Sequence, residues 1–533
     1  MAAVLERLED RLSAPAPAPP AGLWRLSALP GLAAIVNAVA FMIIRPGVND
    51  LWAARARANA ADHGVGLTYW FSWFGGGSTP GNYSVLSPYL SALLTAELVG
   101  ALAAVAITPL CALLLKDSRY PLAGVATASA AAGLNLWSGR VPFILGCAFA
   151  VAALIAVKAQ RRVSAVALTL LSVLASPVSG AFLALGVAGS LIESKAHRAI
   201  SATTIATVAV GFGLVALAFG TPGPEHFSYP LCAETVAGLV LFLFARPPAY
   251  LRTVIYLSIA AALVLTVVPN GMGSNFARMA WFVLPAAVLA TSGRRLWIAL
   301  LATVPVVLLG ADGTVSDLRV AARPVSQTSY YKPLAAELDK LNGLANYRVE
   351  IVTRGAHAAY DALLDHAMLA RGWETQEDNA LNKTLLNPDL DATSYKVWLD
   401  NNSVGYVAVP SSKRDKSSEF NLVTSGALKF LTKVWSGLDW TLYRVADPIP
   451  IVAPPQNVLD YSQSHLTIRV PCVCTFSVRV RWSKFLRAQA VPVDAVSSGV
   501  SARVFDDGYG YTSITTTAPG DYILRGSVTK IFH

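Results

Sequence analysis

The stretch "PYLSALLTAELVGALAAVAITPLCALLLKDSRYPLAGVATASAAAGLNLWSGRVPFILGCAFAVAALIAVKAQRR", residues 88–162, decides the fold of this chain. It contains three apolar runs of the length needed to cross the roughly 30 Å hydrocarbon core of a bilayer. The connectors at 116–120 and 158–162 are basic, whereas the one at 137–142 is mainly polar and aromatic. Because Lys and Arg gather in the cytoplasmic loops of membrane proteins, the stretch predicts membrane helices with the two basic connectors inside.

The same alternation continues over residues 26–311, where we expect about eleven membrane-spanning helices. The chain is 54% hydrophobic and 14% charged, against about 25% charged residues in an ordinary soluble protein. Every second connector is basic, which predicts a cytoplasmic amino terminus and an extracytoplasmic tail. Residues 1–25 are charged and then rich in proline, without a signal-peptide cleavage site, and are predicted to be a cytoplasmic leader.

The net charge of +10 has a topological explanation. In a soluble protein it would suggest nucleic acid, but here the Lys and Arg residues lie mainly between apolar runs, so we expect a lipid bilayer and no nucleic acid. Cys472 and Cys474 lie two apart on an expected strand and should point to opposite faces. Two such ligands are too few for zinc, and no metal site or cofactor is predicted, although a divalent metal is not excluded.

The tail has the composition of a water-soluble protein and divides into two predicted modules. Residues 312–450 read as an α/β module, with strands at 347–352, 404–409 and 440–445 and helices at 331–343 and 356–372. Residues 451–533 read as a β-sandwich of short strands and turns, including the turn "APGDY" between two strands.

The first outer loop, residues 45–87, contains a candidate general base. Asp50 follows the first span by a few residues, where burial near an apolar boundary would raise the pKa of its carboxyl group toward neutrality. An equally weighted alternative is that Asp50 caps the following helix. Asp62 and His63 are weaker candidates for the same role.

Two arginines are expected at the outer ends of spans. Arg140 lies in "NLWSGRVPF" and Arg278 in "NGMGSNFARMAWF", on the side opposite the basic connectors. A guanidinium group matches phosphate oxygens and stays protonated, which favours a phosphate-binding role. The alternative is that both side chains extend to lipid headgroups. Nearby, "PEHFSY" adds Glu225 and His226 as polar candidates.

The aromatic and glycine-rich stretch "GLTYWFSWFGGGSTPGNYSVL" begins at Gly66 and precedes the second span. It lacks the Lys and Ser/Thr of a phosphate-binding loop. We interpret Trp70, Trp73 and Tyr83 as stacking surfaces for sugar rings, with the glycines giving access to them. The alternative is an interfacial aromatic belt.

The loops together resemble a known family. "YWFSWFGGGSTPGNYSVLSPYLSALL", "WSGRVPFILGCAFA", "SPVSGAFLAL" and "NFARMAWFVLP", with "RGWETQEDNALNKTL" in the tail, resemble actinobacterial membrane proteins of the GT-C glycosyltransferase superfamily. The nearest branch is labelled "6-pyruvoyl-tetrahydropterin synthase-related membrane protein", a label that does not describe its chemistry. The first loop departs from the superfamily in having a lone Asp50 rather than an Asp-x-Asp or His-Glu-Asp triplet.

The resemblance implies a GT-C fold that moves a sugar, arabinose or mannose, from a polyprenyl-phosphate carrier to a cell-envelope polysaccharide or glycolipid. By position, Asp50 would be the base, Arg140 and Arg278 would contact the donor phosphate, and the loop aromatics with His226 would contact sugar. Two alternatives remain: a lipid or glycolipid transporter or flippase, and a non-catalytic membrane scaffold whose sandwich binds cell-wall polysaccharide.

Overall fold

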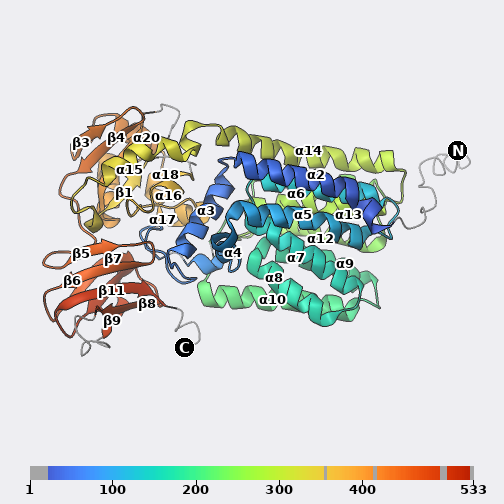
Figure 1. Ribbon diagram of the computed structural model, residues 1–533, viewed down its shortest axis with the longest axis horizontal. Coiled ribbons are helices and arrows are strands. Elements are labelled where there is room, and N and C mark those ends of the chain that lie inside the picture. Colours follow the sequence, from blue (N-terminus) through green and yellow to red (C-terminus); the bar gives the residue numbers. More distant parts are fainter. Residues whose placement is uncertain are drawn as a thin grey trace, which may run out of the picture. The chain divides into compact units, whose positions relative to one another are not determined.

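The computed structural model describes residues 22–77, 79–221, 223–352, 357–411, 417–491 and 501–527. Most of the predicted leader lies outside these residues. The chain forms two compact units (Figure 1). The first takes the chain up to Ala54, then Tyr83–Leu217 and Gly223–Ala321, and the second takes Arg55–Asn82, Ala218–Pro222 and the chain from Ala322 onward.

These boundaries differ from the predicted ones in two places. The last long helix continues to Ala321, so the expected connector that begins at Gly310 is helical and belongs to the first unit. The first outer loop is divided between the units, because its aromatic and glycine-rich part packs with the tail.

The first unit is helical, and its long helices run beside one another in Figure 1. Helix α3 (Asn49–Asp62) begins in this unit and passes into the second. The other elements are α2 (Leu23–Ile44), α4 (Ser87–Leu94), α5 (Ala96–Leu115), α6 (Pro121–Trp137), α7 (Val141–Lys158), α8 (Arg162–Ala175), α9 (Pro177–Glu193), α10 (Arg198–Phe219), α11 (Tyr229–Leu243), α12 (Ala249–Val267), η2 (Gly273–Ala277), the π-helical turn η3 (Met279–Val283), α13 (Leu284–Thr291) and α14 (Leu296–Ala321).

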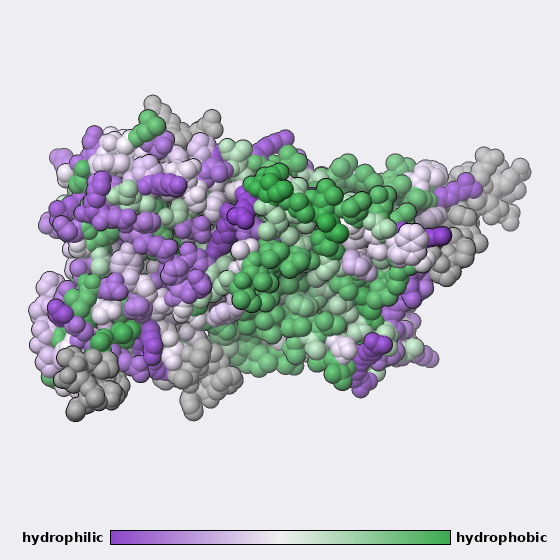
Figure 2. Space-filling model, viewed as in Figure 1, coloured by the Kyte–Doolittle hydropathy of each residue, from purple (hydrophilic) through white to green (hydrophobic). Residues whose placement is uncertain are grey.

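Within the described residues, six of these helices are long and apolar enough to cross a membrane: α2, α5, α7, α10, α12 and α14. Three shorter apolar helices, α8, α9 and α11, coincide with further predicted spans, and the expected number of about eleven spans stays a prediction. Large apolar side chains on the long helices face outward, including Leu29 at 73% and Leu217 at 79% exposure. The hydrophobic surface over this unit is visible in Figure 2. Since a soluble protein rarely exposes so wide an apolar surface, this is a polytopic helical membrane protein.

The basic connectors meet at one end of the helical unit. Lys158, at the end of α7, donates to Asp117 after α5 at 3.0 Å, and Gln160 donates to the carbonyl of Ala196 at 3.3 Å. Tyr120 donates to the carbonyl of Arg294 at 3.2 Å. The connectors without such basic clusters lie at the opposite helix ends, as the alternation in the sequence predicts.

The second unit contains a four-stranded sheet in the order β1-β2-β4-β3, in which β1 and β2 are parallel and the other pairs antiparallel. All three predicted strands are present, with β3 in addition. The elements of this part are η1 (Pro80–Asn82), η4 (Pro324–Ser326), η5 (Thr328–Tyr330), α15 (Lys332–Leu338), η6 (Leu344–Asn346), β1 (Arg348–Ile351), α16 (Ala359–Ala362), α17 (Thr375–Leu381), α18 (Lys383–Leu386), α19 (Ala392–Asn401), β2 (Val404–Pro410), α20 (Ser418–Thr424), β3 (Leu431–Ser436) and β4 (Trp440–Val445).

The helix predicted over 356–372 is wrong beyond one short turn, α16. The later part of this segment runs beside β1. The amide of Val349 donates to the carbonyl of Met368 at 2.8 Å, and the amide of Ala370 donates to the carbonyl of Val349 at 3.0 Å. Pairing with a buried strand outweighs the helix propensity of an alanine-rich segment.

The last part of the chain forms a second sheet of seven antiparallel strands, in the order β5-β6-β11-β8-β9-β10-β7. Apolar side chains from both ends of this sheet share one core cluster, so the sheet folds over itself as a sandwich. The "APGDY" turn connects β10 to β11, which pair with different neighbours. The strands are β5 (Asn457–Tyr461), β6 (His465–Val470), β7 (Thr475–Arg481), β8 (Leu486–Ala490), β9 (Ser501–Asp506), β10 (Tyr511–Thr515) and β11 (Gly520–Gly526).

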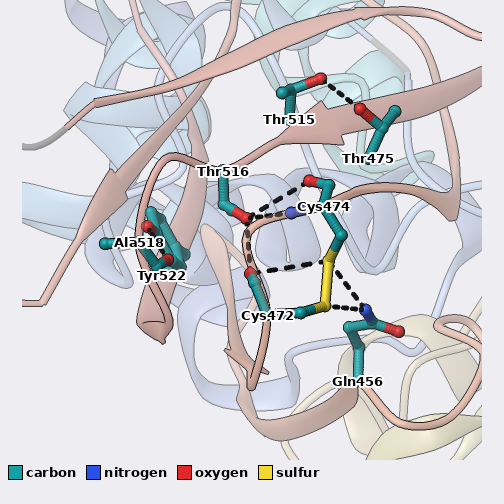
Figure 3. The surroundings of a disulfide bond; sticks show 8 residues. All are labelled: Gln456, Cys472, Cys474, Thr475, Thr515, Thr516, Ala518 and Tyr522. Carbon is teal, nitrogen blue, oxygen red and sulfur yellow. Dashed lines mark hydrogen bonds between the residues drawn. A yellow bond between two sulfur atoms is a disulfide. The ribbon is translucent and has the colours of Figure 1, made fainter.

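Cys472 and Cys474 form a disulfide, contrary to the expectation that they point to opposite faces. They lie in the turn between β6 and β7 rather than on a strand, so the period-two alternation does not apply to them. Gln456 donates to both sulfur atoms, at 3.3 Å each (Figure 3). Tyr522 donates to the carbonyl of Ala518 at 2.7 Å.

Candidate functional site

Arg140 is the centre of a polar cluster in the first unit, directly before α7. Its guanidinium group lies 3.4 Å from Asp317 of α14 and 3.6 Å from Asp50 of α3, and it donates to the side chain of Asn135 at 3.3 Å. Each of these contacts is longer than a strong charge-assisted hydrogen bond, about 2.7–2.9 Å. The Arg140 side chain is 13% exposed, against 43% for Asp50 and 39% for Asp317. A largely buried cation is therefore held only loosely by two half-exposed carboxylates.

Burial lowers the pKa of Arg140 to about 10, and the positive charge of Arg278 lowers it further, while Asp50 and Asp317 oppose the shift. At neutral pH the guanidinium group stays protonated. A second cation close enough to lower the pKa of Arg140 favours an anion between the two guanidinium groups.

Arg278 lies between η2 and η3, and its guanidinium carbon is 5.2 Å from the centre of the Phe143 ring. Among the described residues it has no hydrogen bond or ion pair with a protein acceptor. Glu225 lies nearby and accepts hydrogen bonds from Ser274 and, at 2.9 Å, from Asn275. Burial raises the pKa of Glu225, while Ser274 and Arg278 lower it. Arg278 is thus a cation whose fork of donors is available to a ligand.

Asp50 is the second residue of α3 and lies in its first turn. The amides of Leu51 and Trp52 both donate to the carbonyl of Val48, so the helix begins before Asp50 and the capping alternative is not what the structure contains. A carboxylate in this first turn is favoured by the helix dipole. With 43% of its side chain exposed, Asp50 lacks the burial expected from the sequence, and its carboxylate is accessible to a ligand.

An apolar cavity of about 750 Å³ lies beneath this cluster, inside the first unit. Asn135, Phe143 and Phe282 line it, and these same residues contact Arg140 or Arg278: Asn135 accepts from Arg140, and the rings of Phe282 and Phe143 lie under Arg140 and Arg278, respectively. Its volume is within the range of about 300–1,000 Å³ found for small-molecule sites.

The cavity extends along the helices toward the basic connectors. Its lining includes α7 from Phe143 to Lys158 and α9 from Ser179 to Glu193. At about 1.5 Å per residue, the first of these stretches covers about 22 Å, most of the roughly 30 Å hydrocarbon core. The cavity is therefore long and apolar. Asn135, Phe143 and Phe282, which contact the two arginines, line one end of it, and Lys158 and Asp117 line the other.

Trp70 and Trp73 do not present their rings to a ligand. They are 1% and 0% exposed, lie in the second unit and stack on each other with ring centres 4.5 Å apart. Trp73 also contacts Phe74, Tyr360 and Trp373 edge to face. We therefore replace the sugar-stacking interpretation of these two residues with a packing role, since protein atoms cover their ring faces.

The three glycines that follow serve the same packing. All have positive φ, and a Cβ atom would lie 2.5 Å from the Tyr69 hydroxyl at Gly76 and 2.7 Å from the Arg481 side chain at Gly77. Arg348, fully buried, donates to the carbonyl of Gly75 at 3.0 Å. The loop needs glycine because buried side chains surround its backbone.

The other predicted residues are dispersed. Tyr83 is half-buried in the first unit and His226 is exposed beside Glu225. Asp62 and His63 are exposed and belong to the second unit, not to the unit that holds Asp50. Asp317 was missed, although a carboxylate within an apolar helix is a recognisable signal. Among the described residues no group of three or more His, Cys, Asp or Glu side chains is arranged to hold a metal.

No protein-family model matches this sequence, and no curated protein matches it. Among solved structures, the chain is similar to the arabinofuranosyltransferase AftD from mycobacteria, determined by single-particle cryo-EM, with 16% sequence identity and a TM-score of 0.44. The similarity covers 85% of this chain and 43% of that one, so the chain spans less than half of that protein's length.

Proposed function

We propose that this protein is a membrane glycosyltransferase that moves a sugar from a polyprenyl-phosphate carrier to an extracytoplasmic glycan or glycolipid. The observation that carries the proposal is the pair Arg140 and Arg278 above a long apolar cavity. A phosphate on a hydrocarbon chain is the ligand class that fits both features at once. The resemblance of the loop motifs to the GT-C superfamily, including its pterin-synthase-labelled branch, supports the same function.

The arginines would hold the donor phosphate. Arg278 has no acceptor of its own among the described residues, and Arg140 is held at 3.4–3.6 Å by Asp317 and Asp50. A phosphate oxygen between the two guanidinium groups would form shorter bonds than either carboxylate does. The prenyl chain would then occupy the apolar cavity, which is lined by α7, α9 and other helices of the first unit.

Asp50 would act as the general base. In the transfer, the acceptor hydroxyl oxygen forms a bond to the anomeric carbon and gives its proton to the Asp50 carboxylate. The bond between the anomeric carbon and the phosphate oxygen breaks, and its electron pair leaves with the phosphate, whose charge Arg140 and Arg278 stabilise. Binding of a phosphate to Arg140 would release Asp50 from its ion pair and free the carboxylate for this proton.

We further propose that the arginine end of the unit and the whole second unit face the extracytoplasmic side. The basic connectors at the opposite end support this orientation. The disulfide between Cys472 and Cys474 supports it independently, because disulfides persist in oxidising compartments. An outer active site would also explain the use of a lipid-linked donor rather than a nucleotide.

The test is sugar transfer in membranes that contain the protein. Radiolabelled polyprenyl-phosphate arabinose and mannose are supplied with cell-wall acceptors to the wild type and to Asp50→Asn. We expect transfer by the wild type and its loss in Asp50→Asn, with donor binding retained because the arginines are unchanged. Arg252→Gln, an exposed arginine at the other end of the unit, is the matched control and should transfer normally. Absence of transfer by the wild type with every donor would overturn the proposal.

The length of the cavity also favours a second candidate, a lipid transporter or flippase. A cavity lined from Phe143 to Lys158 offers a path for a single lipid chain across most of the bilayer. Ala150 lines the middle of this path. If the protein is a transferase, Ala150→Trp should reduce transfer from long-chain donors and spare donors with short chains. If it is a flippase, the wild-type protein in liposomes should move a fluorescent prenyl phosphate across the bilayer without transferring sugar.

A further inference from the structure

A second cavity, of about 270 Å³, lies within the second unit, between the four-stranded sheet and the beginning of the sandwich. Its lining is unlike that of the apolar cavity in the helical unit. Three features define its chemistry: amide side chains, tyrosine rings and a single cation. The side chains that matter are Asn342, Tyr347, Tyr406, Arg444, Gln456 and Asn457.

The amide side chains give this pocket paired donors and acceptors. Asn342 and Asn457 each offer an N–H₂ group and a carbonyl oxygen, and neither side chain forms a hydrogen bond with another described residue. No Asp or Glu is among the lining residues, so the pocket does not suit a metal ion or an ammonium group. Arg444 is the one cation, which is too few for a multiply charged phosphate ligand.

The two tyrosines supply ring surface, and their positions are fixed by the backbone. Tyr406 of β2 is directly opposite Arg444 of β4 in the antiparallel pair, so both side chains lie on one face of the sheet. Tyr347 packs on Gly405, where a Cβ atom would lie 2.7 Å from the Tyr347 Cβ. Both rings are half-buried, with part of their surface open to the pocket.

The disulfide supports one wall of the pocket. Gln456 is 7% exposed and donates its side-chain N–H to the sulfur atoms of both Cys472 and Cys474 at 3.3 Å (Figure 3). These two acceptors fix the orientation of a side chain that also lines the pocket. The turn between β6 and β7 thus contributes to the shape of a site to which it does not itself belong.

From these contacts we propose that the pocket is a binding site for a neutral saccharide unit of a glycan, separate from the arginine cluster. Sugar hydroxyl groups both donate and accept hydrogen bonds, which matches amide side chains, and the C–H faces of sugar rings pack on aromatic rings. The volume is just below the roughly 300 Å³ of the smallest drug-sized sites, which suits one or two sugar rings at the end of a chain. The site would retain a glycan at the second unit whether or not the first unit transfers sugar.

The experiment measures the binding of fluorescent neutral arabino-, manno- and gluco-oligosaccharides to the full chain in lipid nanodiscs, by fluorescence anisotropy. We expect saturable binding of at least one of them, weakened about five- to tenfold by Asn457→Ala, which removes one hydrogen-bonding side chain. Tyr406→Ala should weaken it at least as much. Asn401→Ala is the matched control, because Asn401 is exposed in the same unit but does not line the pocket, and its binding should equal that of the wild type.

Asn457→Asp guards against a folding artefact, since it keeps the shape and removes the donor. It should weaken binding without lowering the unfolding temperature. Asp50→Asn should bind oligosaccharide normally, and Asn457→Ala should still transfer sugar to a short acceptor, so failure of this site and failure of the proposed transferase are distinguishable. Absence of binding by the wild type, or equal binding by Asn457→Ala, Asn457→Asp and Asn401→Ala, overturns the proposal. Preference for an acidic over a neutral oligosaccharide would also overturn it.

Discussion

Arg140 in the first unit and Arg371 in the second are both largely buried arginines, yet they have opposite surroundings. Arg371 donates to both carboxylate oxygens of Asp378, at 2.6 and 2.9 Å, and contacts Glu350 and Glu419 at 3.4 Å. Arg140 has two half-exposed carboxylates at 3.4 and 3.6 Å and a second cation, Arg278, nearby. Arg371 therefore has three acidic partners, one of them at a short distance. Arg140 has two acidic partners, and neither makes a short ion pair with it.

The difference separates structure from function. Burial of a charge costs free energy unless the charge is well paired, and the buried guanidinium group of Arg371 has three acidic partners within the fold. The Arg140 and Arg278 pair is incomplete without an anion. A partially satisfied cluster is what we expect of a binding site, because its hydrogen-bonding groups remain available to a ligand.

The largest expected effect is on the stability of the second unit. Arg371→Met removes the guanidinium group that contacts Glu350, Asp378 and Glu419, so three acidic groups lose an ion pair inside the folded unit. We expect a loss of about 3–5 kcal/mol in the free energy of unfolding, measured by limited proteolysis with mass-spectrometric mapping of the second unit. Arg371→Lys keeps the charge and should recover part of the loss. A wild-type proteolysis pattern in Arg371→Met would show that the cluster does not support the fold.

The next effect is on activity with the fold preserved. Arg278→Gln removes a guanidinium group that has no described protein acceptor, so the unfolding free energy should change by less than about 0.5 kcal/mol. Sugar transfer should nevertheless fall about 100- to 1,000-fold, as for the loss of one donor to a developing negative charge. Arg278→Lys should lose less activity, since it keeps a point charge without the fork. If Arg278→Gln unfolds at a clearly lower temperature than the wild type, Arg278 has a structural role like that of Arg371, and the contrast between the two clusters is wrong.

The smallest expected effect is on the pH dependence of folding stability, through the titration of Glu350 in the Arg371 cluster. Burial and the neighbouring Glu419 raise the pKa of Glu350 well above its ordinary value. The folded state therefore keeps a proton that the unfolded chain releases, so stability falls as pH rises from about 4.5 to the raised pKa. Glu350→Gln removes this titration, and its unfolding temperature should vary less with pH and be higher than the wild type's at neutral pH. Asp389→Asn, at an exposed acid, is the control, and an unchanged pH profile in Glu350→Gln would contradict the prediction.

The outcome at Trp70 and Trp73 explains part of what the sequence could not predict. Aromatic residues beside three glycines fit an open sugar site and a packed loop equally well, because both use ring surface and close backbone approach. The buried neighbours that decided between them, Arg348, Tyr360 and Trp373, are about 270–300 positions away in the sequence. Similarly, the alanine-rich segment 356–372 is not helical for most of its length, because β1 offers it strand partners.

The sequence alone determined the helical membrane unit, the separate β-rich tail and the gathering of basic connectors at one end. Each follows from local composition and period, which need no distant partner. It also singled out Asp50 and Arg140, which the fold brings to within 3.6 Å. Only the tertiary structure added Asp317, the cavity along α7 and α9, the disulfide in its turn and the amide-lined pocket, because these depend on residues from separate segments meeting in space.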